Sequence, residues 1–424
     1  MNIFDQYLES LAKLISFKSV KGEPDGDAPF GLETKRALEY FLEVGKSMGF
    51  ETINHENYAG EVLFGEGEDF GIIGHLDVVP EGIGWDTDPY TLTIKDDVAY
   101  GRGVDDNKGP TLACLFALKQ LKDEGFVPKK RLHLIAGCNE ETGWEDVKYL
   151  EAKGGVLPEQ GFSPDGCFPA TYAEKGILNA HFYLPKLKNY SGIKGGTVIN
   201  AVCALVTANA TEQGINESLL HKHGLMLKDG NVIESVGKSA HGSTPHLGKN
   251  AILPLLEYFT ECGEDLSNVI DCLFKDKHGL SSIANEQGML TFSPNLICEK
   301  DGEVVISCDC RFPAPYKLEE VLAIIDKFGI KYDYKYNKPP FMVEKDGFVI
   351  TSLLKAYRDV TGDMTPPKSL GGSTFARAFK SGCSFGPTLP GSNHHVHEPN
   401  EQFKISELKT MFEIYYKAIK NICE

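Results

Sequence analysis

The first third of the chain alternates between helical and strand-like apolar patterns, and this alternation restricts the fold more than any other feature. Apolar residues recur at helical spacing over residues 3–15 and again over 33–48. Residues 70–75 and 131–136 are short apolar runs typical of buried strands, and a further helix is predicted to run from Pro110 to about Leu121. Strands separated by helices favour a mostly parallel sheet with helices on both faces. We therefore predict an α/β fold.

From about residue 177 to residue 343 strand patterns dominate instead. The pairs Asp229-Gly230 and Asp301-Gly302 each separate two apolar runs, which is a strong signal for a β-hairpin. Helical patterning returns at 348–360 and ends at Gly362. We therefore predict an inserted α+β lid domain with an antiparallel sheet over 177–343, which interrupts a discontinuous α/β domain formed by 1–176 and 344–424.

Charge and composition exclude several classes of protein. Lys and Arg total 43 against 60 Asp and Glu in 424 residues, and the net charge of -17 argues against nucleic acid or an anionic membrane as a partner. The longest apolar run is far shorter than the ~20 residues of a membrane helix. Eleven cysteines without any C-x-x-C spacing, together with an N-terminus that lacks a secretory signal, lead us to expect reduced thiols and a cytoplasmic protein.

Acidic residues and histidines gather directly after predicted strands, where ligands collect in open α/β sheets. The segments are GHLD (74–77), GVDDNKG (103–109), CNEETG (138–143) and SPDG (163–166), and a fifth segment, 392–401, adds three histidines. Taken singly, each could be an ordinary turn or a solvated face. However, Glu140 and Glu141 follow a buried strand, where two uncompensated carboxylates are costly and a pair of divalent metal ions would compensate them. The H-E-x-x-H pattern is absent, which argues against a mononuclear zincin.

The motifs GHLDVVP, YGRGVDDNKGP, CNEETGW, SPDG and HEPNE occur in this order along the chain. Together they resemble the co-catalytic (dinuclear) zinc metallopeptidase family of acetylornithine deacetylase, succinyl-diaminopimelate desuccinylase, aminoacylase, carboxypeptidase G and carnosinase. The longer stretches HLDVVPEGIGWDTDPY, FSPDGCFPATYAEKGI and GGSTFAR are most similar to the bacterial dipeptidase V branch.

The resemblance implies two divalent metal ions per chain, with Zn²⁺ expected and Mn²⁺ or Co²⁺ as alternatives that the same ligands serve. The implied ligands are His75, Asp106 and Asp165 for one ion, and Asp106, Glu141 and His397 for the other. Asp106, and not Asp105, takes the bridging position because it precedes the motif lysine by two residues. A cis peptide bond is expected after Asp106. His397 matches the family's H-x-x-x-E spacing to Glu401, whereas His394 and His395 are expected to be loop or supporting residues.

The resemblance also implies the catalytic residues. Glu140 would act as the general base on a water activated by the metal pair and would pass the proton to the leaving amine. Asp77 would hydrogen-bond the other ring nitrogen of His75. His241, in the lid motif GKSAHGSTPHLGKNA, would donate a hydrogen bond to the developing oxyanion. The alternative for His241 is a buried structural histidine.

Substrate recognition is expected in the inserted segment. Ser307, Asp309 and Arg311 alternate with apolar residues and share the polar face of a predicted strand over 304–312. The resemblance makes Arg311 the anchor of the substrate carboxylate, and an ion pair with Asp309 is the structural alternative. Three further contacts are implied by the family motifs: Asn200, and Gly371 and Gly372, whose main-chain amides could approach the ligand closely. Arg377 is either a second carboxylate contact or part of a structural ion pair.

These observations predict a metal-dependent dipeptidase that hydrolyses small unblocked dipeptides. An N-acyl-amino-acid deacylase of the desuccinylase type would share every metal ligand. The long inserted segment favours the dipeptidase, because longer lids in the family resemble those of monomeric dipeptidases, whose lid histidine acts within its own chain. A monomer is therefore expected. A non-catalytic, ligand-binding relative is a third alternative, although Glu140 and all the metal positions are occupied as the chemistry requires.

Overall fold

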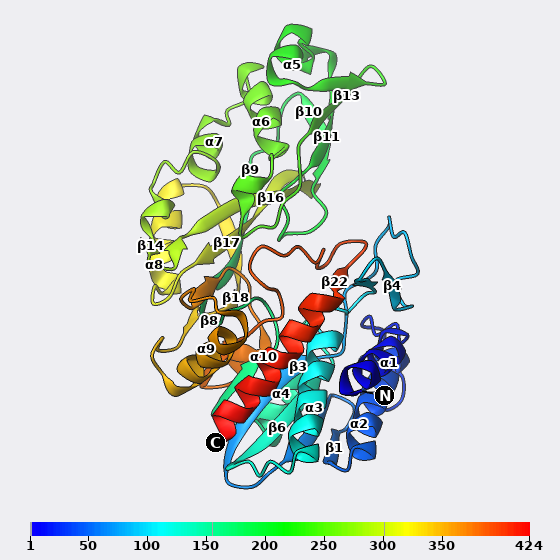
Figure 1. Cartoon of the computed structure of the whole chain (residues 1–424). Coiled ribbons are helices and arrows are strands. Elements are labelled where there is room, and N and C mark those ends of the chain that lie inside the picture. The colour runs from blue at the N-terminus through cyan, green and yellow to red at the C-terminus, as the bar shows by residue number, and fades with distance from the viewer. Residues whose placement is uncertain (1, 155, 301) are drawn as a thin grey trace. The chain divides into compact units, whose positions relative to one another are not determined.

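The chain folds into two compact units, seen in a computed structural model that describes residues 2–154, 156–300 and 302–424. The first unit comprises Met1–Tyr172, Val343–Lys368 and Ser373–Glu424, and the second comprises Ala173–Met342 and Ser369–Gly372. The second unit is thus one long insertion into the first, and a short later segment, Ser369–Gly372, also belongs to it (Figure 1). The α/β fold with an inserted antiparallel part is confirmed.

The first unit is built on a mixed sheet whose centre is parallel. The strand order is β1 (Glu51–His55), β2 (Ala59–Phe64), β6 (Lys130–Gly137), β3 (Glu68–His75), β7 (Gln160–Ser163), β21 (Ser381–Ser384), β8 (Thr171–Glu174) and β19 (Phe341–Met342). Of these strands, β19 and the last two residues of β8 are counted with the second unit. The four central strands β6, β3, β7 and β21 pair in parallel, and the outer strands pair antiparallel. Because β6, β3 and β7 run the same way, the segments that follow them emerge at one edge of the sheet.

Helices cover both faces of this sheet. They are α1 (Ile3–Ile15), α2 (Leu32–Ser47), α3 (Lys108–Asp123), α4 (Glu145–Lys153), α9 (Phe348–Thr361) and α10 (Ile405–Cys423). On one face, Gly60 of β2 lies against the side chains of α2, and Phe162 of β7 stacks on Tyr415 of α10, which lies beside α3 (Figure 1). On the other face, Ile73 and Ile135 pack against α4 and the short helix η5 (Phe375–Ala378).

The second unit is an eight-stranded antiparallel sheet. Its order is β12 (Met226–Lys228), β13 (Val232–Val236), β11 (Leu205–Ala210), β10 (Tyr190–Gly195), β16 (Thr291–Lys300), β17 (Glu303–Phe312), β9 (Gly176–Leu184) and β18 (Tyr332–Lys338). Its helices are α5 (Glu217–His223), α6 (Ile252–Glu261), α7 (Ser267–Leu273) and α8 (Leu318–Ile325). Cys308 and Cys310 of β17 lie in the core with the residues of α6, α7 and α8, so one face of β17 is apolar as the alternation predicts.

Local sequence signals were accurate where a turn or cap specifies the backbone. The hairpin at Asp229-Gly230 joins β12 to β13, and Gly362 ends α9 with φ 71°. Asp301 of the second predicted turn lies outside the described residues. Helix α3 begins at Lys108, two residues before the predicted start, because Pro110 fits in a first turn where no intrahelical N–H is required.

Among the described residues, no helix has both the length and the apolar character needed to cross a membrane.

Candidate metal centre and substrate residues

The carboxyl edge of the parallel strands collects the predicted metal ligands of the first unit. β3 ends at His75, and Glu141 follows the end of β6. Asp165 stands two residues after the end of β7. Asp106 precedes α3, and His397 lies in the loop before β22 (Gln402–Lys404). These five residues come from five separate segments, and they are named here the candidate metal centre.

Asp106 lies between the two histidines of this centre. Its Oδ1 is 3.0 Å from Nε2 of His75, and its Oδ2 is 2.9 Å from Nε2 of His397. Glu141 Oε1 is 3.1 Å from the same nitrogen of His397, and Asp165 Oδ2 is 4.0 Å from Nε2 of His75. Ligand atoms of His75, Asp106 and Glu141 all lie within 4.8 Å of one another. One carboxylate oxygen thus faces each histidine, as a bridging ligand requires.

The electrostatics of the centre favour a bound cation. Burial raises the pKa of Glu140 well above its usual range and also raises the pKa of Glu141. Burial acts in the same direction on Asp106, but hydrogen bonds with His397 and His75 hold its pKa far below the usual range. Burial opposes protonation of His397, and its hydrogen bonds to Asp106 and Glu141 nevertheless raise its pKa to about 11. Carboxylates outnumber imidazoles here, and such a donor set fits divalent ions of the zinc type.

Asp77 supports two parts of the centre at once. Nδ1 of His75 lies 3.0 Å from the main-chain carbonyl of Asp77 and 3.5 Å from its carboxylate, so the carbonyl is the nearer partner. The carboxylate of Asp77 accepts the main-chain N–H groups of Glu140 and Glu141, each at 3.1 Å. The sequence predicted only the contact with His75. The hydrogen bonds from Glu140 and Glu141 to the Asp77 carboxylate are visible only in the folded structure.

Glu401 is a supporting residue to which the sequence analysis assigned no role. It is fully buried, and its carboxylate accepts the main-chain N–H groups of Gly103, Asp105 and Asp106 at 2.9–3.1 Å. Nη1 of Arg102 donates to the same carboxylate at 2.8 Å. Glu401 therefore fixes the loop that presents Asp106. The only sequence feature that pointed to Glu401 was its position at the end of the HEPNE motif.

The neighbours of the centre match two further expectations. The peptide bond between Asp106 and Asn107 is cis. His394 is buried, with Nδ1 at 2.6 Å from Asp105 and Nε2 at 3.0 Å from Glu407, so it supports the same loop. His395 is half-buried in this segment.

In the second unit the structure places Arg311 beside Gly371 and His241 beside Asn200. Nε of Arg311 donates to both carboxylate oxygens of Asp309 at 2.9 and 3.0 Å, and Nη1 donates to the Gly371 carbonyl at 3.0 Å. His241 is exposed, which excludes the buried structural alternative. Asn200 is adjacent to it, because the Asn200 carbonyl accepts the Gly242 N–H at 2.7 Å.

The face of β17 that carries Arg311 is polar, but it is not open to water. Arg311 is only 6% exposed and Asp309 is 0% exposed, so the ion pair considered as an alternative does form. The ion pair uses Nε of Arg311, and Nη1 donates to the Gly371 carbonyl, so the two contacts together orient the guanidinium. Gly372 follows Gly371 within the second unit, whereas Arg377 belongs to η5 of the first unit, half-buried.

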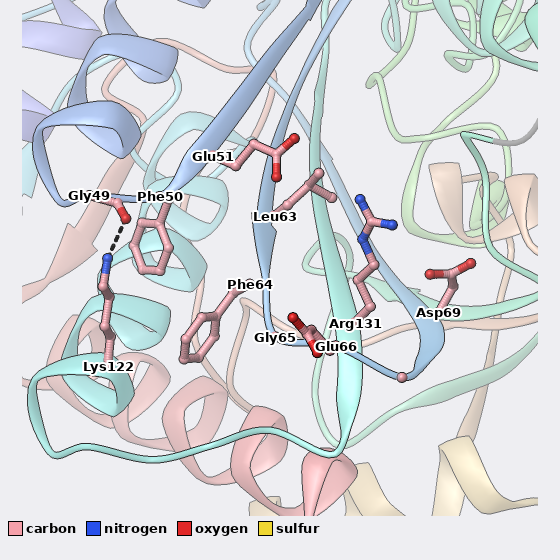
Figure 2. A pocket seen from close by; sticks show the side chains of 11 residues that line it. Gly49, Phe50, Glu51, Leu63, Phe64, Gly65, Glu66, Asp69, Lys122 and Arg131 are labelled. Atoms are coloured by element: carbon pink, nitrogen blue, oxygen red, sulfur yellow. Dashed lines mark hydrogen bonds between the residues drawn. The ribbon is translucent and has the colours of Figure 1, made fainter.

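A pocket of about 640 Å³ lies elsewhere on the first unit (Figure 2). Its lining includes Glu51, Phe64, Asp69 and Arg131, which stand at or near the beginnings of β1, β3 and β6 and the end of β2. Asp69 and His75 stand near opposite ends of β3, so the pocket and the candidate metal centre lie at opposite edges of the sheet.

Comparison with known proteins assigns the family. Residues 71–421 match the peptidase family M20/M25/M40, and the chain belongs to this family. A Staphylococcus saprophyticus protein named "Putative dipeptidase SSP1012" is 31% identical over 458 residues, which cover 99% of this chain and 97% of that protein. A similarly named Staphylococcus epidermidis protein is 32% identical over 461 residues, with the same coverage. The chain is therefore a peptide-bond hydrolase, and the predicted resemblance is confirmed.

Solved structures support the same fold at low sequence identity. The di-peptidase Dug1p from Saccharomyces cerevisiae matches with a TM-score of 0.61 and 15% identity, over 99% of this chain and 96% of that one. The Bacillus subtilis YXEP protein, a dinuclear metal binding peptidase of the M20 family, matches with a TM-score of 0.53 and 9% identity, over 99% and 98% of the two chains.

Proposed function

We propose that this chain is a metal-dependent dipeptidase that hydrolyses the amide bond of small unblocked dipeptides. The observation that carries the proposal is the position of Asp106 between His75 and His397, with Glu141 and Asp165 beside them. The staphylococcal relatives with dipeptidase names support the substrate class.

The candidate metal centre would hold two divalent ions, of which Zn²⁺ is the first choice and Mn²⁺ or Co²⁺ the alternatives. His75, Asp106 and Asp165 would hold one ion, and Asp106, Glu141 and His397 would hold the other. When bound, such ions lower the proton affinity of a water and stabilise the negative charge that develops during hydrolysis. The dinuclear metal binding peptidase from Bacillus subtilis, which shares the fold, supports this number of ions.

Glu140 serves as the general base. Its main-chain N–H is held by Asp77, and its pKa is raised by burial and by the neighbouring carboxylates of Asp165, Glu141 and Asp106. A carboxylate whose pKa is raised binds a proton more readily, so it can accept a proton from the attacking water and return it to the leaving amine. Glu140 does not need to be a ligand for this role.

Recognition of the substrate falls to the second unit. Arg311, oriented by Asp309, receives the free carboxylate of the dipeptide, and His241 donates to the oxyanion. Asn200 and the main-chain amides of Gly371 and Gly372 complete these contacts, with Arg377 as a second candidate for the carboxylate. A monomeric state and a cytoplasmic location remain predictions from the sequence.

Turnover of matched substrates tests the proposal. The chain, loaded in turn with Zn²⁺, Mn²⁺ or Co²⁺, should cleave free dipeptides faster than N-acetyl and N-succinyl amino acids of the same side chains. Faster cleavage of the N-acyl amino acids would instead establish the deacylase alternative. Absence of turnover on both groups, with metal bound, would indicate the non-catalytic alternative.

A further inference from the structure

Ser243 holds the imidazole of His241 from two positions further along the chain. Nδ1 of His241 lies 2.7 Å from the hydroxyl oxygen of Ser243 and 3.2 Å from its main-chain nitrogen. A main-chain N–H can only donate a hydrogen bond, so Nδ1 must present a lone pair to it. A neutral imidazole carries one proton, which is therefore on Nε2. Two contacts from one residue thus select a single tautomer of His241.

We propose that Ser243 is a positioning residue that keeps His241 in the tautomer whose Nε2 carries the proton. The inference rests on the proposed function, in which His241 donates to the developing oxyanion. An imidazole in the opposite tautomer would present the lone pair of Nε2 to that negative charge and would repel it. Ser243 therefore determines what fraction of the enzyme has a competent donor.

The place of Ser243 depends in turn on Gly371. A Cβ atom added to Gly371 would lie 2.6 Å from Cβ of Ser243 and 3.0 Å from its Oγ, which is too close for both residues to keep their positions. The carbonyl of Gly371 also accepts the hydrogen bond from Nη1 of Arg311. Gly371 therefore touches the residue that holds His241 and, separately, Arg311. Any side chain at position 371 should displace Ser243 from the imidazole.

The tautomer can be observed directly in the zinc-loaded enzyme labelled with ¹⁵N-histidine. Long-range ¹H–¹⁵N spectra distinguish a protonated ring nitrogen from an unprotonated one, and comparison with His241→Gln assigns the signals of His241 among the 12 histidines. In the parent enzyme Nδ1 should be unprotonated and Nε2 protonated. Ser243→Ala should produce a mixture of tautomers, and Gly371→Ala should do the same with the serine still present.

Kinetics on a free dipeptide connect the tautomer to catalysis. Ser243→Ala should lower kcat about 10-fold, less than the roughly 10²–10³-fold cost of losing an oxyanion donor, because the main-chain N–H remains. KM should change little, since Ser243 does not carry the carboxylate contact. Ser243→Cys keeps a weaker donor without adding a branch, and should give an intermediate kcat. Ser281→Ala is the control, because this exposed serine lies in the short helix η3 (Leu280–Ser282) of the same unit and bonds Asp276.

The outcomes separate this inference from the proposed function. A proton on Nδ1 in the parent enzyme, or a Ser243→Ala variant with unchanged tautomer and kcat, would overturn the role of Ser243. An unchanged kcat in His241→Gln would overturn the donor role of His241 and, with it, any catalytic consequence of Ser243. Failure of every dipeptide as a substrate, with the tautomer as expected, would instead refute the proposed dipeptidase activity.

Discussion

The carboxylate of Asp77 accepts the main-chain N–H of Glu140 at 3.1 Å, although the two residues are 63 positions apart in the sequence. The other oxygen of the same carboxylate accepts the N–H of Glu141 at the same distance, and Nδ1 of His75 lies 3.5 Å from the oxygen that accepts from Glu140. One buried side chain therefore sets the position of the proposed base and of two proposed ligands. This geometry makes Asp77 a support of the whole centre and not of His75 alone.

Asp77→Asn should weaken metal binding by about 10–100-fold, the usual effect of losing a carboxylate that supports a metal ligand. The asparagine amide would point its own N–H₂ at one of the two main-chain donors, so the Glu140-Glu141 segment should shift. Competition with a chelating dye measures the affinity. Asp123→Asn, at an exposed end of α3, is the matched control. An affinity equal to that of the control would contradict the supporting role.

Glu140→Gln and Glu141→Gln should have opposite consequences for metal content. Glu140→Gln should keep both ions and lower kcat by roughly 10²–10⁴-fold, the usual contribution of a general base. Glu141→Gln should lose metal, because it removes a charged ligand. Elemental analysis together with turnover at saturating substrate separates the two. Equal metal content in the two variants would show that base and ligand are assigned wrongly within the pair.

Metal removal should abolish activity reversibly and lower the stability of the first unit. Ions that bind only the folded state stabilise it, so Tm should fall on treatment with a chelator and recover on readdition of Zn²⁺. Elemental analysis should approach two equivalents per chain. Asp106→Asn should lose more metal than Asp165→Asn, since Asp106 is placed to serve both ions. A fully active metal-free preparation would refute the metal-dependent mechanism.

Arg311→Met should lower kcat/KM for a free dipeptide by about 10²–10³-fold, the equivalent of roughly 3–4 kcal/mol. It should also lower Tm, because Asp309 would be left buried without its partner. The double variant Arg311→Met/Asp309→Asn removes that unpaired charge and should recover Tm but not kcat/KM. A C-terminally amidated dipeptide should be a poor substrate and lose little further in either variant. Equal losses for free and amidated substrates would make Arg311 purely structural.

A network of charges around the buried Glu61, outside the candidate metal centre, should give the protein a pH-dependent stability. Glu61 is 3% exposed and lies 2.6 Å from His133 and 2.9 Å from His55, and His133 lies 2.8 Å from Asp69. Burial opposes ionisation of Glu61, but its hydrogen bonds with the two histidines lower its pKa from 4.5 to about 2. Burial likewise opposes protonation of His133, and its hydrogen bonds to Glu61 and Asp69 raise its pKa.

The directions of the two pKa shifts define the pH range in which Glu61 and His133 stabilise the folded protein. The contribution of Glu61 is present above its unfolded pKa of about 4.5 and is lost as the pH falls toward 2. The contribution of His133 is present below its unfolded pKa of 6.5 and is lost as the pH rises through its higher folded value. The difference in Tm between the parent and Glu61→Gln should therefore be largest near pH 5–6. Glu68→Gln is the exposed control, and a difference that does not vary with pH would contradict the coupling.

Much of the architecture could be read from the sequence because it depends on local signals. Apolar periodicity predicted the helices at 3–15 and 348–360 and the buried strand that ends at His75, and Asp-Gly and Gly362 marked a turn and a helix end. These features depend on residues close in the chain. The short helices α5 and α7, seven residues each, carried too little periodicity to be predicted.

The sequence by itself determined the kind of chemistry, since its ordered motifs supplied imidazoles, carboxylates and an arginine of the types that a dinuclear peptidase needs. Only the tertiary structure decided which atoms meet. The position of Asp106 between His75 and His397 depends on bringing the ends of three strands and two loops to one edge of a sheet. The hydrogen bonds of Asp77 to Glu140 and of Glu401 to the Asp106 loop, and the close approach of Gly371 to Ser243, involve residues 63 to 298 positions apart. Such contacts depend on the packing of the folded chain, and no local pattern of residues encodes them.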